Sequence, residues 1–440
     1  MSDIFKAYDI RGVYNKDWNK SDAYKIGYFL PKLLGGKKFA VGRDVRASSD
    51  EIFEHLVAGI TDAGGDVYDL GLTATPMVYF STVKYEMDGS VMITASHNPP
   101  EYNGMKVSRK LAMPVGLESG LADLKKMVES EITVKSSKKG KVHKLDFMKD
   151  YPDHLKKFAR NIKPLKVVLD TANGMGGLLI PKLLEDLGFE VTNLFPELDG
   201  TFPNHLPDPL KEENLVDLKK MVVKKKADLG IAIDGDADRV MFVDENGGYI
   251  SADLILPVMG KLLLKDQKGY VIYDVRSSRS VPEEIKKLGG TPYMWKVGHA
   301  YMKQKMRELD GVFGGELAGH YYFRDNFYTD CGTVALLCVL SALSMGTKKI
   351  SELIAEIKHY HFSGEINFKV EDKAGKIKLL LNKYADGKLV DIDGIRVDYP
   401  DYWFNVRPSN TEPFLRLVVE AKTDELMKKK TKELTDLIKA

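Results

Sequence analysis

Apolar positions along the chain repeat one order of elements three times: a strand, a helix, a second strand and, further on, a third strand. Short apolar runs that end in a polar turn predict the first strands at Phe39–Asp44, Val167–Asp170 and Tyr270–Asp274. The helical pattern after each run stops at a residue that helices favour just beyond their last turn, namely Gly64, Gly188 and Gly289.

A second strand and a third, apolar strand follow in each copy. The second strands are predicted at Val67–Leu70, Val191–Leu194 and Pro292–Val297, and the third at Val91–Thr94, Leu229–Ile233 and Val312–Phe313. Two of these runs look buried throughout, as is typical of parallel strands that helices cover. We therefore interpret the three segments as diverged copies of one α/β unit.

A chain of 440 residues is long enough for three or four domains of ordinary size. Polar or glycine-rich stretches separate the copies, and we predict α/β domains at residues 1–145, 146–247 and 248–360. Residues 361–440 alternate differently and predict a smaller α+β domain. The predicted fold class is α/β, with three similar domains built on mixed sheets and a smaller C-terminal α+β domain.

Composition narrows the possible partners. The net charge of only +2 provides no global excess of positive charge for binding nucleic acid, so any phosphate site must be built locally. The most apolar stretch, Thr333–Met345, is shorter than the roughly 20 residues that cross a bilayer, and it predicts a buried helix and no membrane partner. Cys331 and Cys338 are predicted to be buried free thiols. Together with a polar start that lacks the apolar core of a signal peptide, they favour the cytoplasm.

Each third strand leads into an unusual polar loop. Because parallel α/β sheets collect their chemistry at the carboxyl ends of the strands, the three loops are predicted to line one cleft. The first loop is TASHNPP, in which Ser96 stands beside His97 and Asn98 and two prolines stiffen the chain. A hydroxyl in this setting suits a positioned nucleophile or phosphate carrier, and the alternative is an ordinary polar turn.

Three aspartates alternate in the second loop, DGDADR: Asp234, Asp236 and Asp238. In an extended loop such carboxylates converge on one side and offer the hard oxygen ligands that Mg²⁺ prefers. Counted from the first aspartate, Glu245 falls at position 12, as in a calcium EF-hand. However, Arg239 occupies the position that an EF-hand needs for glycine, and a strand rather than a helix precedes the loop. We therefore favour the magnesium site.

The remaining polar loops offer groups that suit hydroxyls and phosphate, and for the third loop the alternative is a plain loop. The third loop, GGELAGH, offers Glu316 as an acceptor for hydroxyls and His320 as a donor or proton carrier. Near the C-terminus, RPSNTEP begins at Arg407 and combines a guanidinium with short polar side chains, which suits a phosphate dianion. The glycine-rich Ala172–Gly177 matches no nucleotide-binding motif and is predicted to be a tight turn between strand and helix.

These four loops, in this order, resemble the α-D-phosphohexomutase family, and most closely its phosphomannomutase/phosphoglucomutase branch. The resemblance covers essentially the whole chain and begins at AYDIRG, Ala7–Gly12. It implies four domains around a central cleft, three of them alike. It also implies an isomerase that acts on a small sugar phosphate, with Mg²⁺ as cofactor and a hexose 1,6-bisphosphate as intermediate and activator.

The resemblance further implies a role for each matched residue. Ser96 would be the phosphoserine, and Lys106 and Arg239 would lie beside the transferring phosphoryl group. With the phosphate on Ser96, three aspartates would bind Mg²⁺, namely Asp234, Asp236 and Asp238. Twelve residues would contact the substrate, namely Tyr8, Arg11, His97, Arg276, His299, Glu316, Ala318, His320, Arg407, Ser409, Asn410 and Thr411.

Two of these positions depart from the common family pattern. Ala318 replaces a serine that helps to bind the sugar, so one hydroxyl contact should be missing. Arg276 stands where many relatives have lysine, which keeps the charge but changes the geometry. Both substitutions bear on substrate preference, and we expect mannose and glucose phosphates to be turned over, with mannose as the physiological sugar.

In the implied reaction, Ser96 gives its phosphoryl group to a hexose 1- or 6-phosphate, the bisphosphate turns end for end, and the other phosphate returns to Ser96. His320 and Lys106 are the candidates for the general base, and the loop at Arg407 would hold the phosphate that is not reacting. The alternatives are a phosphoglucosamine mutase and a metal-dependent phosphatase with a serine nucleophile.

Overall fold

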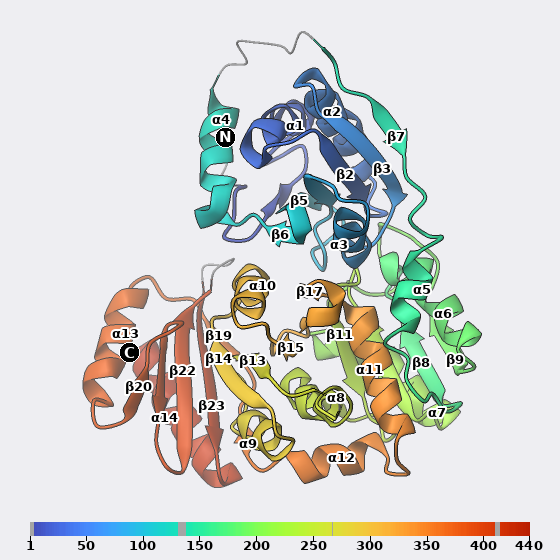
Figure 1. Cartoon of the computed structure of the whole chain (residues 1–440). Helices are drawn as coiled ribbons and strands as arrows, with labels where there is room; N and C mark the ends of the chain where they lie inside the picture. Colours follow the sequence, from blue (N-terminus) through green and yellow to red (C-terminus); the bar gives the residue numbers. More distant parts are fainter. Residues whose placement is uncertain (1–3, 131–137, 266, 410–413) are drawn as a thin grey trace.

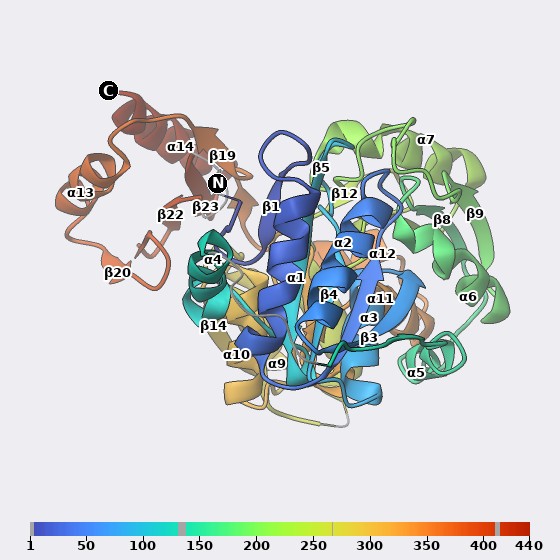
Figure 2. The same cartoon turned by 90° about the horizontal axis from the view of Figure 1, so that it is seen from above.

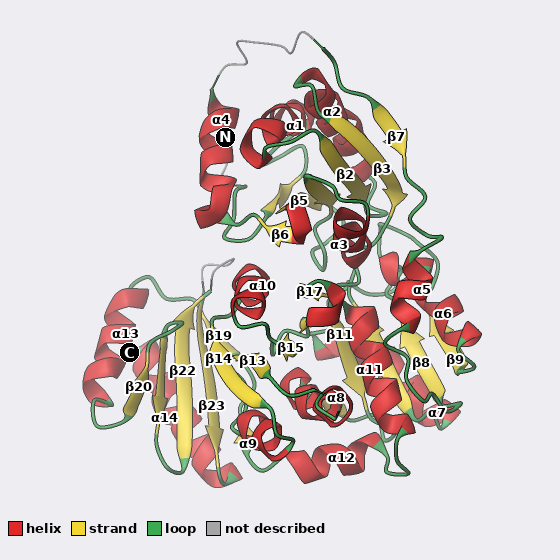
Figure 3. Cartoon of the chain, viewed as in Figure 1, coloured by secondary structure: helices red, strands yellow, loops and turns green. Residues whose placement is uncertain are grey.

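The computed structural model describes residues 4–130, 138–265, 267–409 and 414–440, which form four units with one sheet each (Figure 1). We call them domains I to IV in chain order. In Figure 3, helices cover the sheets of the first three, and Figure 2 shows domain IV to one side of the rest.

Domain I contains β1 Ile10–Val13, α1 Lys20–Leu34, β2 Lys38–Arg43, α2 Ser49–Asp62, β3 Asp66–Leu72, α3 Thr75–Lys84, β4 Gly89–Ile93, β5 Tyr102–Arg109, β6 Met113–Pro114, α4 Ala122–Glu129 and β7 Val142–Lys144. Domain II contains α5 Tyr151–Lys156, β8 Lys166–Asp170, α6 Ile180–Asp186, β9 Glu190–Leu194, α7 Val216–Lys225, β10 Leu229–Ile233, β11 Val240–Val243 and β12 Tyr249–Ile250.

Domain III contains α8 Ile255–Leu263, β13 Tyr270–Asp274, α9 Ser280–Lys287, β14 Thr291–Trp295, α10 His299–Glu308, β15 Phe313–Gly315, β16 Tyr321–Phe323, β17 Thr329–Asp330, α11 Gly332–Ser344 and α12 Ile350–Ile357. Domain IV contains β18 His361–Phe362, β19 Ile366–Phe368, α13 Lys373–Lys383, β20 Lys388–Val390, β21 Ile395–Asp398, β22 Tyr402–Pro408, β23 Leu415–Ala421 and α14 Asp424–Lys439.

The sheets of domains I to III share one plan. In each, a central strand pairs in parallel with two neighbours: β2 with β3 and β4, β8 with β9 and β10, and β13 with β14 and β15. The next strand along the chain then adds antiparallel to the third, as β5, β11 and β16. The predicted fold class with mixed sheets is confirmed, and the carboxyl ends of β4, β10 and β15 take equivalent places in the three sheets.

Two predicted elements differ in extent from the structure. β14 ends at Trp295, two residues before the predicted end, because the chain turns at Gly298 with a φ of +128°. The helix predicted from Leu178 begins as a short 3₁₀ turn, Met175–Leu178, and continues as α6. Pro181 lies in the first turn of α6, where the missing N–H costs nothing.

The first three domains share one buried apolar cluster, domain I adds a second cluster around Ile52 and Leu56, and the fourth domain has a separate cluster. One buried cluster joins Ala40 and Met77 of domain I, Val168 of domain II and Val334 of domain III. Domain IV has its own cluster along β21, β22, β23 and α14. Domain IV is therefore a body of its own, and its place beside domain III rests on other contacts.

The predicted buried helix is confirmed as α11, all of whose residues are buried. Cys331 and Cys338 are buried free thiols, as predicted. Among the described residues, no helix combines the length and the apolarity that a membrane span requires.

Candidate active site

The loops that follow β4, β10 and β15 meet, although they belong to three domains. Ser96 Oγ donates a hydrogen bond to Asp234 Oδ2 at 2.7 Å, which joins the first loop to the second. A backbone bridge pairs Arg239 with His320, and Val240 N–H donates to Gly319 O at 3.1 Å, which joins the second loop to the third. The common sheet plan therefore brings three loops that are distant in sequence into contact.

Ser96 is buried and its backbone is strained. Its φ of +52° lies in the left-handed region, which side-chain-bearing residues rarely adopt. The side-chain oxygen of Thr94 accepts the Ser96 N–H at 2.9 Å. Arg239 Nη2 donates to Ser96 Oγ at 3.1 Å, so the hydroxyl lies between a carboxylate and a guanidinium. Such strain at a reactive group is typical of a positioned nucleophile.

The second loop approaches the Ser96 backbone closely. A Cβ added at Gly235 would lie 2.3 Å from Ser96 O, so only glycine fits at this contact. On the other side of the loop, a Cβ at Gly332 would lie 3.0 Å from Arg239 O, at the start of buried helix α11. The loop is therefore clamped between the Ser96 loop and α11.

Arg46, which sequence analysis missed, braces the Ser96 loop from within domain I. Its guanidinium donates to the backbone oxygens of Ser96 at 2.8 Å, Asn98 at 2.6 Å and Pro99 at 2.5 Å. Asp44 Oδ2 accepts from Arg46 Nε at 3.2 Å, and the arginine side chain is 0% exposed. Its position just after the carboxyl end of β2 was the available sequence signal.

The three aspartates form a buried cluster, and their ligand atoms lie within 4.8 Å of one another. Lys106 Nζ, on β5, donates to Asp236 Oδ2 at 2.6 Å and also to Asp238 Oδ2. Thr75 Oγ1, at the start of α3, donates to Asp236 Oδ2 at 2.5 Å, a contact that the sequence did not reveal. Domain I thus supplies two of the groups that hold the aspartate loop.

The donor set of this cluster fits a divalent cation. Asp236 Oδ1 and Asp238 Oδ1 are buried and find no hydrogen-bond donor among the described residues. Buried carboxylate oxygens without donors are costly unless a cation is bound, and hard oxygens are what Mg²⁺ prefers. A second group, Asp238, His320 and Asp330, is less suited to Mg²⁺ because it offers a ring nitrogen in place of one carboxylate oxygen.

Burial and mutual repulsion separate the protonation of the three carboxyls. Burial and the neighbouring Asp238 raise the pKa of Asp234 to about 7. Burial also opposes ionisation of Asp236 and Asp238, but the Lys106 ammonium outweighs it and lowers the pKa of both. The cluster therefore carries negative charge at neutral pH.

His97 accepts rather than donates in this site. Burial and the adjacent Arg239 guanidinium hold the pKa of His97 well below its ordinary value, so the ring is neutral. Arg239 Nη2 contacts His97 Nδ1. The Nε of the same arginine donates to Asp234 Oδ2 at 3.0 Å. Arg239 thus links the hydroxyl, the imidazole and one carboxylate.

The third loop is fixed around Glu316, which is 2% exposed. Gly298 N–H donates to Glu316 Oε1 at 2.6 Å, and the Tyr322 hydroxyl donates to Oε2 at 2.5 Å. Tyr322 is a second residue that sequence analysis missed. Ala318 lies half-buried in the turn that Gly319 N–H closes onto Glu316 O at 3.0 Å.

His320 lies between two carboxylates. Its Nε2 is 3.5 Å from Asp238 Oδ1, and its Nδ1 is 3.6 Å from Glu316 Oε2. Burial disfavours the charged ring, but Asp238 and Glu316 raise the pKa of His320 above its ordinary value. His320, a candidate proton carrier, thus lies between Asp238 of the second loop and Glu316 of the third loop.

The predicted residues of the opening motif lie at the contact between domains I and III. The Tyr8 hydroxyl donates to Val297 O at 3.0 Å, and its ring packs edge-on against His299 with 5.5 Å between centroids. Arg11 Nη1 donates to Asn98 Oδ1 at 2.6 Å, which ties β1 to the Ser96 loop. The His299 and His320 rings are 6.1 Å apart, so this contact adjoins the third loop.

Arg276 and Arg407, two of the predicted substrate contacts, lie where domain III meets domain IV. Arg276 Nη2 donates to Asp274 Oδ2 at 2.7 Å, and the same carboxylate oxygen accepts from Leu317 N–H of the third loop at 2.8 Å. Arg407 is 2% exposed at the end of β22, and Ser409 follows it. The predicted contacts Asn410 and Thr411 lie outside the described residues.

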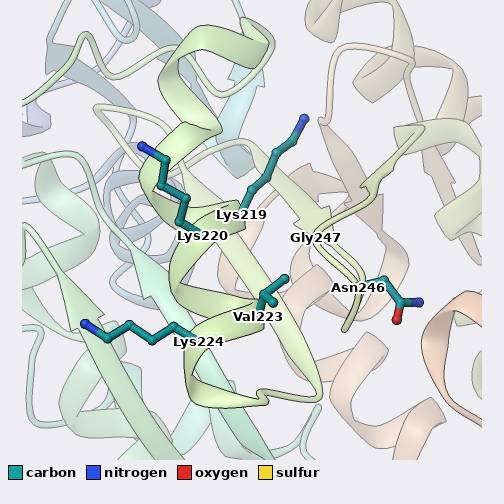
Figure 4. Close-up of a pocket in the computed structure, with 6 residues that line it drawn as sticks. All are labelled: Lys219, Lys220, Val223, Lys224, Asn246 and Gly247. Atoms are coloured by element: carbon teal, nitrogen blue, oxygen red, sulfur yellow. The ribbon is translucent and has the colours of Figure 1, made fainter.

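A hollow on domain II lies apart from these loops (Figure 4). It is lined by Lys219, Lys220, Val223, Lys224, Asn246 and Gly247. In Figure 4 the lysine side chains extend away from one another, and Lys219 Nζ lies 2.6 Å from Glu212 Oε2. None of the predicted site residues lines this hollow, so it is not the candidate site.

Family models match almost the whole chain. Phosphoglucomutase/phosphomannomutase alpha/beta/alpha domains I, II and III match residues 2–133, 149–248 and 251–360, and the C-terminal domain matches residues 365–437. A phosphomannomutase of Methanocaldococcus jannaschii is 38% identical over 441 residues, which are 99% of this chain and 97% of the relative. A phosphomannomutase of Vibrio cholerae is 38% identical over 454 residues, 99% of this chain and 98% of the relative.

A solved structure agrees with these relatives. The crystal structure of a phosphoglucomutase/phosphomannomutase family protein from Burkholderia thailandensis has a TM-score of 0.90 and 32% identity, over 100% of this chain and 98% of that chain. The chain therefore belongs to the phosphoglucomutase/phosphomannomutase family and is a phosphohexomutase, an isomerase.

Proposed function

We propose that this phosphohexomutase interconverts the 1- and 6-phosphates of mannose and of glucose, with Ser96 as phosphoryl carrier and a hexose 1,6-bisphosphate as intermediate. The observation that supports the proposal most directly is the position of Ser96 Oγ, 2.7 Å from Asp234 Oδ2 and 3.1 Å from Arg239 Nη2. A buried hydroxyl between an acceptor and a fixed cation suits a group that repeatedly gains and loses a phosphoryl group.

The metal of this proposal is Mg²⁺. Its protein ligands would be the three clustered aspartates and the phosphate on Ser96. When bound, the ion would neutralise charge on the oxygens of the transferring phosphoryl group. The unpartnered oxygens of Asp236 and Asp238 support this assignment.

The chemical step exchanges one phosphorus–oxygen bond for another. The bond from phosphorus to Ser96 Oγ breaks as a sugar hydroxyl oxygen bonds to phosphorus, and the hydroxyl proton moves to the base. Arg239, whose Nη2 is 3.1 Å from Ser96 Oγ, stabilises the freed oxygen. In the second half, Ser96 Oγ attacks the other phosphate of the reoriented bisphosphate, and the proton returns to the sugar oxygen.

Among the two candidates for the general base, we favour His320. Lys106 donates to two carboxylates that raise its pKa, so its ammonium is a poor proton acceptor and a better partner for phosphoryl oxygens. His320 has a pKa that burial lowers and two carboxylates raise, and its ring adjoins both Asp238 and Glu316. It can therefore exchange a proton beside the sugar.

Glu316 would accept hydrogen bonds from the O3 and O4 hydroxyls, at which mannose and glucose are alike. They differ at C2, and Ala318 offers no hydroxyl that could distinguish them. We therefore propose a preference no larger than about a hundredfold, roughly what one modest contact supplies. The phosphate that is not reacting would bind to Arg407 and Ser409, with Asn410 and Thr411, at the edge of domain IV.

Mass spectrometry of the intact protein tests the carrier. After incubation with a hexose 1,6-bisphosphate, the wild type should gain the mass of one phosphoryl group, and Ser96→Ala should not. A transferred group on the Ser96→Ala variant would contradict the proposal. A panel of hexose 1-phosphates then tests the sugar, because a preference of several thousandfold, or turnover of glucosamine phosphate alone, would reject mannose and glucose as substrates.

A further inference from the structure

Glu365 is surrounded by three guanidinium groups at the contact between domains III and IV. Arg276 Nη1 lies 3.0 Å from Glu365 Oε2, and Arg416 Nη1 lies 3.0 Å from Oε1. Arg407 Nη2 lies farther away, 3.5 Å from Oε2. Glu365 follows Gly364, whose φ is +74°, in the segment that enters domain IV. One carboxylate thus forms ion pairs with cations of both domains.

Two of the three arginines would repel each other without this carboxylate. Arg407 and Arg416 are direct partners in the antiparallel pairing of β22 and β23, so their side chains leave the same face of the sheet. Like charges at such positions destabilise a strand pair, and Arg407 is 2% exposed, so water screens it poorly. The Glu365 carboxylate therefore offsets the repulsion between the two arginines and stabilises this strand pair.

Glu365 carries one of the negative charges that face these guanidiniums. Asp274 carries another and lies 2.7 Å from Arg276, and the charge of Asp393 also acts on Arg407. Removal of the Glu365 charge would leave Arg407 with one anion fewer beside it, so a phosphate dianion at Arg407 would meet less repulsion.

The contacts also indicate which arginine can change partners. Arg276 is held by two carboxylates, and Arg416 has the short contact to Oε1. Arg407 has the longest contact to Glu365, and its buried Nε finds no acceptor within the part of the chain that the structure describes. Arg407 is also the residue to which the proposed function assigns the non-reacting phosphate.

We infer that Glu365 is a positioning residue for the reaction: an internal anion that competes with the non-reacting phosphate for Arg407 and so limits how tightly that phosphate is held. This inference rests on the proposed function, in which the bisphosphate must leave this pocket to turn end for end. A pocket that neutralised the phosphate fully would retain the intermediate and slow its reorientation. Glu365 thus lets Arg407 bind the phosphate while keeping that binding weak enough for the bisphosphate to dissociate from it.

Removal of the negative charge tests the inference. In Glu365→Gln, inorganic phosphate measured by calorimetry should bind about tenfold more tightly, the scale expected for one charge at this distance. KM for the hexose phosphate and kcat should both fall. Glu365→Asp keeps the charge and should bind phosphate like the wild type. Asp398→Asn is the matched control, because it removes a carboxylate that pairs with Arg279 and Arg396 at the same domain contact.

A double-mutant cycle assigns the gain to Arg407. In an Arg407→Gln background, Glu365→Gln should no longer tighten phosphate binding. A purely structural role for Glu365 predicts the opposite result, weaker phosphate binding with KM raised, and that result, or a gain that survives in the Arg407→Gln background, would overturn the inference. If Glu365→Gln does not fold, Glu365→Ala with the same readouts takes its place.

The inference and the proposed function fail in different experiments. If the wild type does not turn over hexose phosphates, the proposed function is wrong whatever Glu365 does. If the wild type binds phosphate and turns over its substrate but Glu365→Gln binds phosphate no more tightly, only the role of Glu365 is wrong.

Discussion

The end of the site around Ser96 and the end around Arg407 are built differently. Around Ser96, three domains that share one buried apolar cluster contribute loops, and hydrogen bonds and close backbone contacts join these loops. Around Arg407, a domain with its own core meets domain III through charged side chains. The first end is set by packing, and the second by ion pairs between two bodies.

The polar joint between domains III and IV is spread over several residues. Arg279 donates to Tyr399 O at 2.6 Å and Asp398 Oδ1 at 2.9 Å, and Arg396 donates back to Val275 O at 2.8 Å. Asp393 Oδ2 accepts from Val297 N–H at 3.0 Å. The comparison teaches that packing fixes the geometry around Ser96, whereas the proposed binding of the second phosphate at Arg407 would depend on a balance of charge.

The largest effect is expected for Ser96→Ala. Because the hydroxyl is the proposed carrier, kcat should fall by about a thousandfold or more, while the thermal midpoint should stay near that of the wild type. Ser130→Ala, at an exposed serine of the same domain, should change neither. Near-native turnover by a folded Ser96→Ala variant would show that Ser96 is not the phosphoryl carrier.

A smaller loss is expected for Asp236→Asn, which removes one ligand charge from the cluster. The affinity for Mg²⁺, measured by calorimetry on the protein without substrate, and kcat should each fall by about a hundredfold. Asp217→Asn, at an exposed position of domain II, is the matched control. Full activity in excess chelator, with no metal bound to the protein, would reject the metal site.

Much of the fold could be predicted because its cause is local. The central strands β8, β10 and β13 are almost wholly apolar, and the strand order β4-β2-β3, β10-β8-β9 and β15-β13-β14 follows the predicted repeat. The errors lie where backbone geometry decides, as at Gly298 beyond β14 and in the 3₁₀ turn before α6. Such features depend on neighbours that periodicity does not show.

The candidate site divides in the same way. Ser96 and the aspartates stand out because their polar loops directly follow buried strands, where parallel α/β sheets collect their chemistry. Arg46, Tyr322 and Glu365 did not stand out, because each acts only through partners that folding brings near, such as the Ser96 loop, Glu316 and the arginines. The roles assigned to Asn410 and Thr411 stay predictions.

Arg46→Met tests how far the Ser96 loop depends on structural support, because Arg46 braces the loop without being one of the proposed catalytic groups. The substitution removes a buried cation that donates to three loop carbonyls and leaves Asp44, 3% exposed, without its ion pair. Breaking a buried pair costs about 3 kcal/mol, so the thermal midpoint should fall and kcat should fall with it. Lys20→Met, which breaks a pair with Glu51 that is 60% and 42% exposed, should cost less than about 1 kcal/mol. Equal midpoints for the two variants would show that the Ser96 loop does not need its brace.

The smallest effect is expected at the charged end and depends on pH. Burial opposes ionisation of Glu365, but Arg276 and its neighbours lower the pKa of the carboxyl from its ordinary 4.5 to about 2. Because the pKa is lowered in the folded state, the stabilisation is complete above about pH 4.5 and is lost as the pH falls towards 2. The shift corresponds to no more than about 3 kcal/mol, of which screening at a side chain 20% exposed leaves about 2 kcal/mol.

Amide hydrogen exchange tests this stabilisation. At pH 6 the amides of β22 and β23 should exchange more slowly in the wild type than in Glu365→Gln, and the difference in protection should shrink by more than half at pH 3. Exchange at β10 should not differ between the two proteins, because the core of domains I to III does not include this ion cluster. A difference that is the same at both pH values would show that packing rather than charge holds domain IV, and the contrast between the two ends would disappear.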